Sequence, residues 1–88
     1  MIYITDVHMS TGGTRHEHIA NVKWNNPETK SGENTRQEIV DWIETGGVAK
    51  VKSGTKEVTV AVVNASPKYL RTHADGVWTD NLLALPRY

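Results

Sequence analysis

Apolar and polar positions alternate along two N-terminal segments, as they do in a strand that is buried on one face. Residues 2–9 are rich in β-branched and aromatic side chains, and residues 17–24 show the alternation directly. Gly12 and Gly13 stand between these segments and supply the backbone freedom that a tight turn requires. The pattern predicts an N-terminal hairpin, followed by a polar loop over residues 25–34.

The apolar spacing changes to a helical period over residues 35–45. Four apolar side chains fall on one side of this segment: Ile39, Val40, Trp42 and Ile43. Thr35 followed three residues later by Glu38 is a capping box, and Gly46 follows the last periodic residue as a helix stop. We therefore expect one amphipathic helix, packed on a sheet through Ile39, Trp42 and Ile43.

The C-terminal half predicts two further hairpins. Residues 48–52 and 57–64 are β-branched segments around a glycine turn, and the second segment is apolar enough for a central strand. Asp75 and Gly76 form a strong hairpin turn between residues 69–74 and 77–79. This turn sets a register that pairs Ala74 with Val77, His73 with Trp78, Thr72 with Thr79 and Arg71 with Asp80.

Together these elements predict a single α+β domain over residues 1–88. We expect a curved antiparallel sheet of five or six strands, built from three hairpins, with the amphipathic helix packed across it. The short apolar run at residues 82–85 is expected to form one helical turn in the core. The strand order stays open, because hairpins and a helix can be assembled in several ways.

Composition narrows the class of protein. The 88 residues include no cysteine, which excludes disulfides and thiolate zinc sites and favours the cytoplasm. We expect no targeting signal and no membrane segment, because the longest apolar stretch, near residues 58–65, is too short to span a bilayer.

The net charge of zero conceals an asymmetry between the two halves of the chain. Residues 1–45 carry four Lys or Arg against seven Asp or Glu, and residues 46–88 carry six against three. The halves therefore have formal charges of −3 and +3. Such a dipole favours either self-association or an anionic partner, although opposite charges scattered over a small surface have neither consequence.

Three segments carry distinctive residue patterns. They are HEHI-x-x-V-x-W from His16 to Trp24, NPET from Asn26 to Thr29, and YLRT-x-ADG-x-WTDNLL-x-LPR from Tyr69 to Arg87. With these segments the chain resembles, over nearly its whole length, a small bacterial family of uncharacterised single-domain proteins. The resemblance implies a bacterial or phage origin. It implies no catalytic or binding residue, because no function goes with the family.

The third predicted hairpin gathers the residue types that bind planar anionic ligands. Its register places six side chains on one face: Tyr69, Arg71, His73, Trp78, Asp80 and Leu82. An indole can stack on a base while a guanidinium holds a phosphate. The same residues also have a purely structural explanation, in which Arg71 and Asp80 form a cross-strand ion pair and Trp78 packs over His73.

Two other groups of residues carry candidate chemistry. On an extended strand His16 and His18 would project from one face and could share a metal ion, with His8 or Asp6 as a third ligand. Two half-exposed histidines beside a turn are the alternative. The basic stripe consists of Lys50, Lys52 and Lys56. Protection of an exposed sheet edge is its favoured explanation, because the pI of 6.9 lacks the basic excess of a duplex binder.

The chain shows no nucleophile motif, and an enzyme is not the favoured reading. We expect a non-enzymatic binding module that uses the third hairpin face and recognises a nucleic-acid strand, a nucleotide or a protein partner. A homo-oligomeric or partner-docking protein is the second hypothesis, supported by the charged halves. A metal-dependent enzyme or metal binder, acting through His16 and His18, is the third, and a metal is the only cofactor considered.

Overall fold

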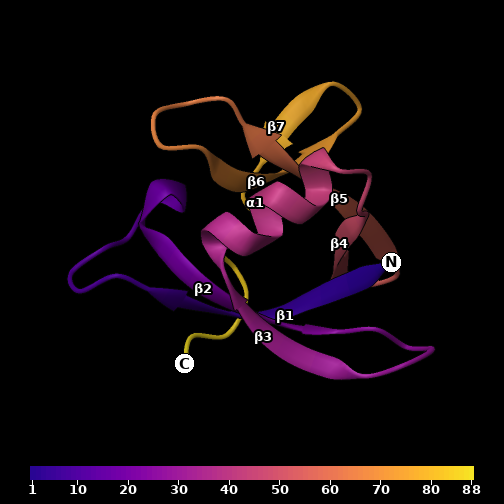
Figure 1. The fold of residues 1–88 in the computed structure, drawn as a ribbon. Helices are drawn as coiled ribbons and strands as arrows, with labels where there is room; N and C mark the ends of the chain where they lie inside the picture. The colour runs from indigo at the N-terminus through magenta and orange to yellow at the C-terminus, as the bar shows by residue number, and fades with distance from the viewer.

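Alternating apolar residues build one continuous seven-stranded sheet in the computed structural model, which describes residues 1–88 (Figure 1). The strands are β1 (Ile2–Met9), β2 (Ile19–Asn25), β3 (Ser31–Thr35), β4 (Ala49–Ser53), β5 (Lys56–Val63), β6 (Tyr69–Ala74) and β7 (Val77–Thr79). A short 3-10 helix, η1 (His16–His18), precedes β2, and the helix α1 (Arg36–Glu44) follows β3. The α+β class with one short helix is confirmed. At nine residues, α1 is too short to cross a membrane.

The strand order across the sheet is β3-β2-β1-β4-β5-β6-β7. Every neighbouring pair is antiparallel except β1 and β4, which pair in parallel through Ile2 with Ala49 and Tyr3 with Lys50. This pair joins the N-terminal three strands to the C-terminal four. Figure 1 shows α1 lying across one side of the curved sheet.

The sheet has seven strands instead of the predicted five or six, because residues 31–34 of the predicted loop belong to an additional strand, β3. β2 continues to Asn25, and β3 begins at Ser31 as its antiparallel partner. The turn between them is closed by the N–H of Asn26, which donates to the carbonyl of Lys30 at 2.8 Å. β3 is an edge strand that buries no residue. It therefore needs no apolar alternation, and its polar sequence SGENT resembles a loop.

The capping residues of α1 act as the sequence predicts. The hydroxyl of Thr35 accepts from the N–H of Glu38 at 3.2 Å, and the Glu38 carboxylate accepts from the N–H of Thr35 at 2.9 Å. Ile39 and Val40 are the buried residues of the helix. Trp42, which we expected in the core, has 36% of its surface exposed.

The third hairpin has the predicted register: Thr72 pairs with Thr79, His73 with Trp78 and Ala74 with Val77. Its turn residues Asp75 and Gly76 have φ angles of 52° and 79°. Two successive positive φ angles are the requirement of a type I′ turn, which matches the twist of the strands that it joins.

The C-terminal segment closes the sheet against β1. The N–H of Val7 donates to the carbonyl of Pro86 at 3.0 Å, and the N–H of Tyr88 donates to the carbonyl of Val7 at 3.2 Å. The N–H of Leu85 donates to the carbonyl of Leu82 at 3.2 Å, within the predicted helical turn. Leu82 is fully buried, and it belongs to a single cluster of 12 apolar core residues drawn from the sheet, α1 and this turn.

Candidate binding surface on the open face of the sheet

One row of side chains crosses five strands on the side of the sheet opposite the core. The register pairs Tyr3 with Lys50, Lys50 with Thr59, Thr59 with His73, and His73 with Trp78. We call these five residues the open-face row. Side chains directly opposite each other on neighbouring strands share a face, so the row runs from β1 to β7 without a break.

Burial of the adjacent residues fixes the direction in which the row points. Ile2 and Ile4 flank the β1 member, and Ala49 and Val51 flank the β4 member; all four are at most 7% exposed. Because successive side chains of a strand point to opposite faces, the row points away from the core. Its two outer strands contribute aromatic rings, and the strands between them contribute an amine, a hydroxyl and an imidazole.

The β7 end of the row is the more exposed of its two aromatic ends. Trp78 is 40% exposed, and its neighbour Val77 at the hairpin tip is 61% exposed. The rings of His73 and Trp78 meet edge to face, with centroids 4.8 Å apart and planes inclined by 71°. One surface of the indole is held in place while part of it stays open to solvent.

The β1 end of the row carries a charged network. The Tyr3 hydroxyl donates to Glu57 at 2.9 Å, and this hydrogen bond raises the pKa of Tyr3. The Nζ of Lys52 lies 4.5 Å from the centre of the Tyr3 ring, at the distance of a cation–π contact. The Nζ of Lys50 lies 3.8 Å from Glu57. One amine therefore lies beside the Glu57 carboxylate, and the other lies over the Tyr3 ring.

Arg71 and Asp80 lie beside the row. Nη2 of Arg71 is 2.9 Å from Oδ1 of Asp80, and its Nε donates to the carbonyl of Thr79 at 3.2 Å. The sequence predicted both this ion pair and the contact between His73 and Trp78, as the structural alternative to ligand binding. Tyr69 pairs with Val63 on β5 and shares the outward parity of Arg71 and His73. Leu82 was wrongly placed on this face, because the chain turns inward after Asp80 and buries it completely.

The basic stripe is divided by the register. Lys50 and Lys52 point to the open face, whereas Lys56, paired with Ser53, has the opposite parity. Edge protection does not explain Lys50, because this residue pairs with Tyr3 of β1 on one side and with Thr59 of β5 on the other. Lys52 lies beyond the two residues of β4 that pair with β1, so edge protection stays a prediction for this residue. Lys50 therefore calls for another explanation.

His16 and His18 lie on η1, not on the extended strand that the metal hypothesis assumed. His16 is 7% exposed; its Nε2 has no hydrogen-bond partner and lies 3.7 Å from Oδ1 of Asp80. Burial, followed by the charge of Arg71, lowers the pKa of His16. Nδ1 of His18 accepts from the N–H groups of Thr14 and Arg15, each at 3.1 Å. The structure contains no group of three or more potential metal ligands, so metal binding stays a prediction.

Sequence reasoning placed the β6–β7 end of this surface and missed Tyr3 and the rest of the row. Their contribution depends on the parallel pairing of β1 with β4, which joins residues far apart in the sequence. No local turn signal specifies such a pair. The spacing of Lys50 and Lys52, two residues apart on one strand, was the one available signal. It places both amines on the same face of the sheet, but only the strand order shows which residues lie beside them.

Comparison with known proteins confirms the resemblance found in the sequence. The model of a family described as "Protein of unknown function (DUF3892)" matches residues 3–86. No match was found among curated proteins or among solved structures.

Proposed function

The chain belongs to this family of unknown function, and we propose that it is a non-enzymatic module that binds single-stranded nucleic acid on the open face of the sheet. The open-face row is the observation that carries the proposal. Stacking on aromatic side chains, combined with cations that follow the backbone, is the general way in which proteins hold single strands. Tyr3 and Trp78 supply rings, and Lys50, Lys52 and Arg71 supply cations on the same face.

The strand order supports an anionic ligand at this place. Residues 1–45, with a formal charge of −3, supply β1–β3 and α1, whereas residues 46–88, with a charge of +3, supply β4–β7. The open face of β4–β7 therefore belongs to the positive half. A polyanion that approaches the protein is drawn to that half, since unlike charges steer an encounter over roughly one Debye length, about 10 Å at 0.1 M salt.

Two carboxylates limit the affinity. Glu57 holds Lys50 and Tyr3, and Asp80 holds Arg71. A phosphate has to replace these partners, so removing a carboxylate frees a cation for the ligand. We expect Glu57→Gln to strengthen binding of an oligonucleotide severalfold, whereas a purely structural role for this network predicts no change in binding.

The test is a fluorescence titration of a labelled oligothymidylate at several salt concentrations. We expect Trp78→Ala to weaken binding by about 5- to 150-fold, the range measured for the loss of one base stack. If all three cations contact phosphates, the slope of log K against log salt should be about −2, and Lys50→Gln should reduce its magnitude by about 0.7.

Lys56→Gln is the matched control, because it removes the same charge from the same hairpin on the opposite parity. Its affinity and salt slope should equal those of the unmodified protein. Equal losses in Lys50→Gln and Lys56→Gln would show that overall charge, not the open face, governs binding. Unchanged affinity in Trp78→Ala would remove the stacking site.

A further inference from the structure

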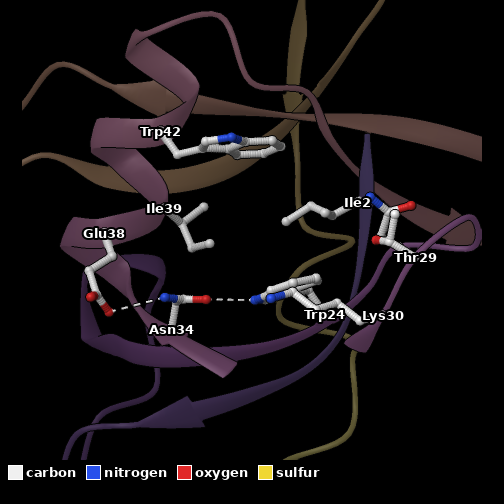
Figure 2. Close-up of a pocket in the computed structure, with 9 residues that line it drawn as sticks. Ile2, Trp24, Thr29, Lys30, Asn34, Glu38, Ile39 and Trp42 are labelled. Atoms are coloured by element: carbon white, nitrogen blue, oxygen red, sulfur yellow. Dashed lines mark hydrogen bonds between the residues drawn. The ribbon is translucent and has the colours of Figure 1, made fainter. Parts of the chain in front are cut away.

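A cleft of about 320 Å³ lies on the other side of the sheet, between α1 and the β2–β3 hairpin. Figure 2 shows the indoles of Trp24 and Trp42 on opposite sides of this cleft, with Ile2 and Ile39 between them. Ile2 and Ile39 are 7% and 4% exposed and form its apolar base. Its volume is at the lower end of the range for small-molecule sites.

Two glycines allow the indoles to occupy these positions. A Cβ atom on Gly32 would lie 2.6 Å from Cζ2 of Trp24, and one on Gly47 would lie 2.2 Å from Cδ2 of Trp42. Real Cβ atoms essentially never approach so closely. Neither glycine has a positive φ angle, so a turn conformation does not require them. These two positions are glycine because the indole rings of Trp24 and Trp42 lie where a side chain would begin.

The α1 end of the cleft carries a fixed negative charge. Nε1 of Trp24 donates to the Asn34 carbonyl at 2.7 Å, and Nδ2 of Asn34 donates to Oε1 of Glu38 at 3.3 Å (Figure 2). The same Oε1 accepts from Thr35, whereas Oε2 of Glu38 has no hydrogen-bond partner. These hydrogen bonds lower the pKa of Glu38, so the carboxylate is ionised at neutral pH.

We propose that this cleft is a second binding site, which takes a small organic cation with a flat aromatic body. Aromatic faces attract cations through their quadrupole, and indole is the strongest of the side-chain rings in this respect. A flat ring placed between Trp24 and Trp42 brings a cationic substituent toward the ionised carboxylate of Glu38. This site is independent of the open face, because its residues point to the opposite side of the sheet.

Lys30 stands at the other end of the cleft, on the β2–β3 turn (Figure 2). It is exposed and takes part in none of the five ion pairs of the structure. Its charge opposes a cationic ligand. We therefore expect Lys30→Gln to increase the affinity for a cation, which distinguishes a cation site from a site for aromatic rings in general.

The test is an NMR titration of the full chain with benzamidine, and with benzoate as the probe of the same ring and opposite charge. The indole N–H signals of Trp24 and Trp42 should shift with benzamidine, while that of Trp78, on the open face, stays as an internal control. Glu38→Gln should weaken benzamidine binding about fivefold or more. Glutamine still serves in a capping box, so this variant keeps α1.

Gly47→Ala is the second variant, because its methyl group displaces the Trp42 ring. Loss of benzamidine binding in folded Gly47→Ala, together with tighter binding in Lys30→Gln, would support the site. Equal binding of benzoate and benzamidine, no effect of Glu38→Gln, or equal shifts at Trp78 would overturn it. None of these outcomes changes the result expected from the oligonucleotide titration. The proposal for the cleft can therefore be wrong while the proposal for the open face is right, and the reverse.

Discussion

Thr72 shows how one buried hydroxyl connects the third hairpin to the C-terminal segment. The residue is fully buried on β6. Its hydroxyl donates to the carbonyl of Thr79 at 3.0 Å and accepts from the N–H of Asn81 at 3.1 Å. Without this hydroxyl the N–H of Asn81 would lose its hydrogen-bond partner, which is costly in free energy, whereas the carbonyl of Thr79 would keep the hydrogen bond from Nε of Arg71. Thr72 thereby fixes the point at which the chain leaves β7 and turns inward.

Thr72→Val should test this role, because valine keeps the shape of the side chain and removes its hydroxyl. We expect the free energy of unfolding to fall by about 1–3 kcal/mol, measured by urea denaturation. Thr59→Val is the matched control on the open face, where the exposed hydroxyl has no partner, and its effect should stay within about 0.5 kcal/mol. Equal losses in the two variants would contradict the role given to Thr72.

At the scale of single elements, α1 depends on the reciprocal cap that Thr35 and Glu38 form. The N-terminal N–H groups of a helix have no partner within the helix, so each cap replaces hydrogen bonds that water would otherwise make. A carboxylate at this end also interacts favourably with the helix dipole. The same carboxylate borders the cleft. The N-terminal cap of α1 and the negative charge of the cleft therefore depend on one residue, Glu38.

The cap makes stability depend on pH. Hydrogen bonds from the Thr35 N–H, then from Asn34 and the Thr35 hydroxyl, lower the pKa of Glu38 below its ordinary value of 4.5. Folding therefore favours the ionised form, and this contribution is complete above pH 4.5 and is lost as the pH falls through the folded pKa. We expect the difference in the free energy of unfolding between the unmodified protein and Glu38→Gln, measured by urea denaturation at several pH values, to become smaller as the pH falls below 4.5. A difference that is constant with pH would contradict this account.

The elements whose signals are local were predictable from the sequence. Asp75 and Gly76 specify their hairpin and its register, since the turn type follows from two residues. Thr35 and Glu38 specify the start of α1 in the same way. β3 could not be predicted from its apolar pattern, because an edge strand with no buried residue has none.

The binding surfaces were only partly predictable, because they depend on contacts between distant segments. The ion pair of Arg71 with Asp80 followed from the hairpin register. The open-face row did not, since it needs the parallel pair of β1 and β4. Trp42 was expected in the core, where most helix-face aromatics lie, and its exposure follows from the cleft that it borders.

At the scale of the whole molecule, the C-terminal segment connects the two halves of the sheet. It leaves β7, buries Leu82 in the core, and ends in hydrogen bonds to Val7 on β1. Tyr88 extends this contact, because its hydroxyl donates to Glu33 on β3 at 2.6 Å. The segment that follows β7 thus contacts β1 and β3, which belong to the other half of the sheet.

Leu82→Ala should therefore act on the whole fold. Removing a fully buried leucine leaves a cavity, and the expected loss is about 2–5 kcal/mol in the free energy of unfolding. Domains of this kind are stable by only about 5–15 kcal/mol, so thermal unfolding should shift to a markedly lower temperature. Leu83→Ala, at a half-buried position of the same turn, should lose less. A larger loss in Leu83→Ala would show that the core contact is misplaced.

We propose that the open face of the sheet, on the positive half of the molecule, binds a single strand of nucleic acid. The most direct measurement is the map of amide and side-chain NMR shifts of the labelled protein during titration with oligothymidylate. The account predicts shifts that follow the open-face row across the sheet, from Tyr3 through Lys50, Thr59 and His73 to Trp78. Shifts confined to α1 and β3, or no shifts at all, would contradict it.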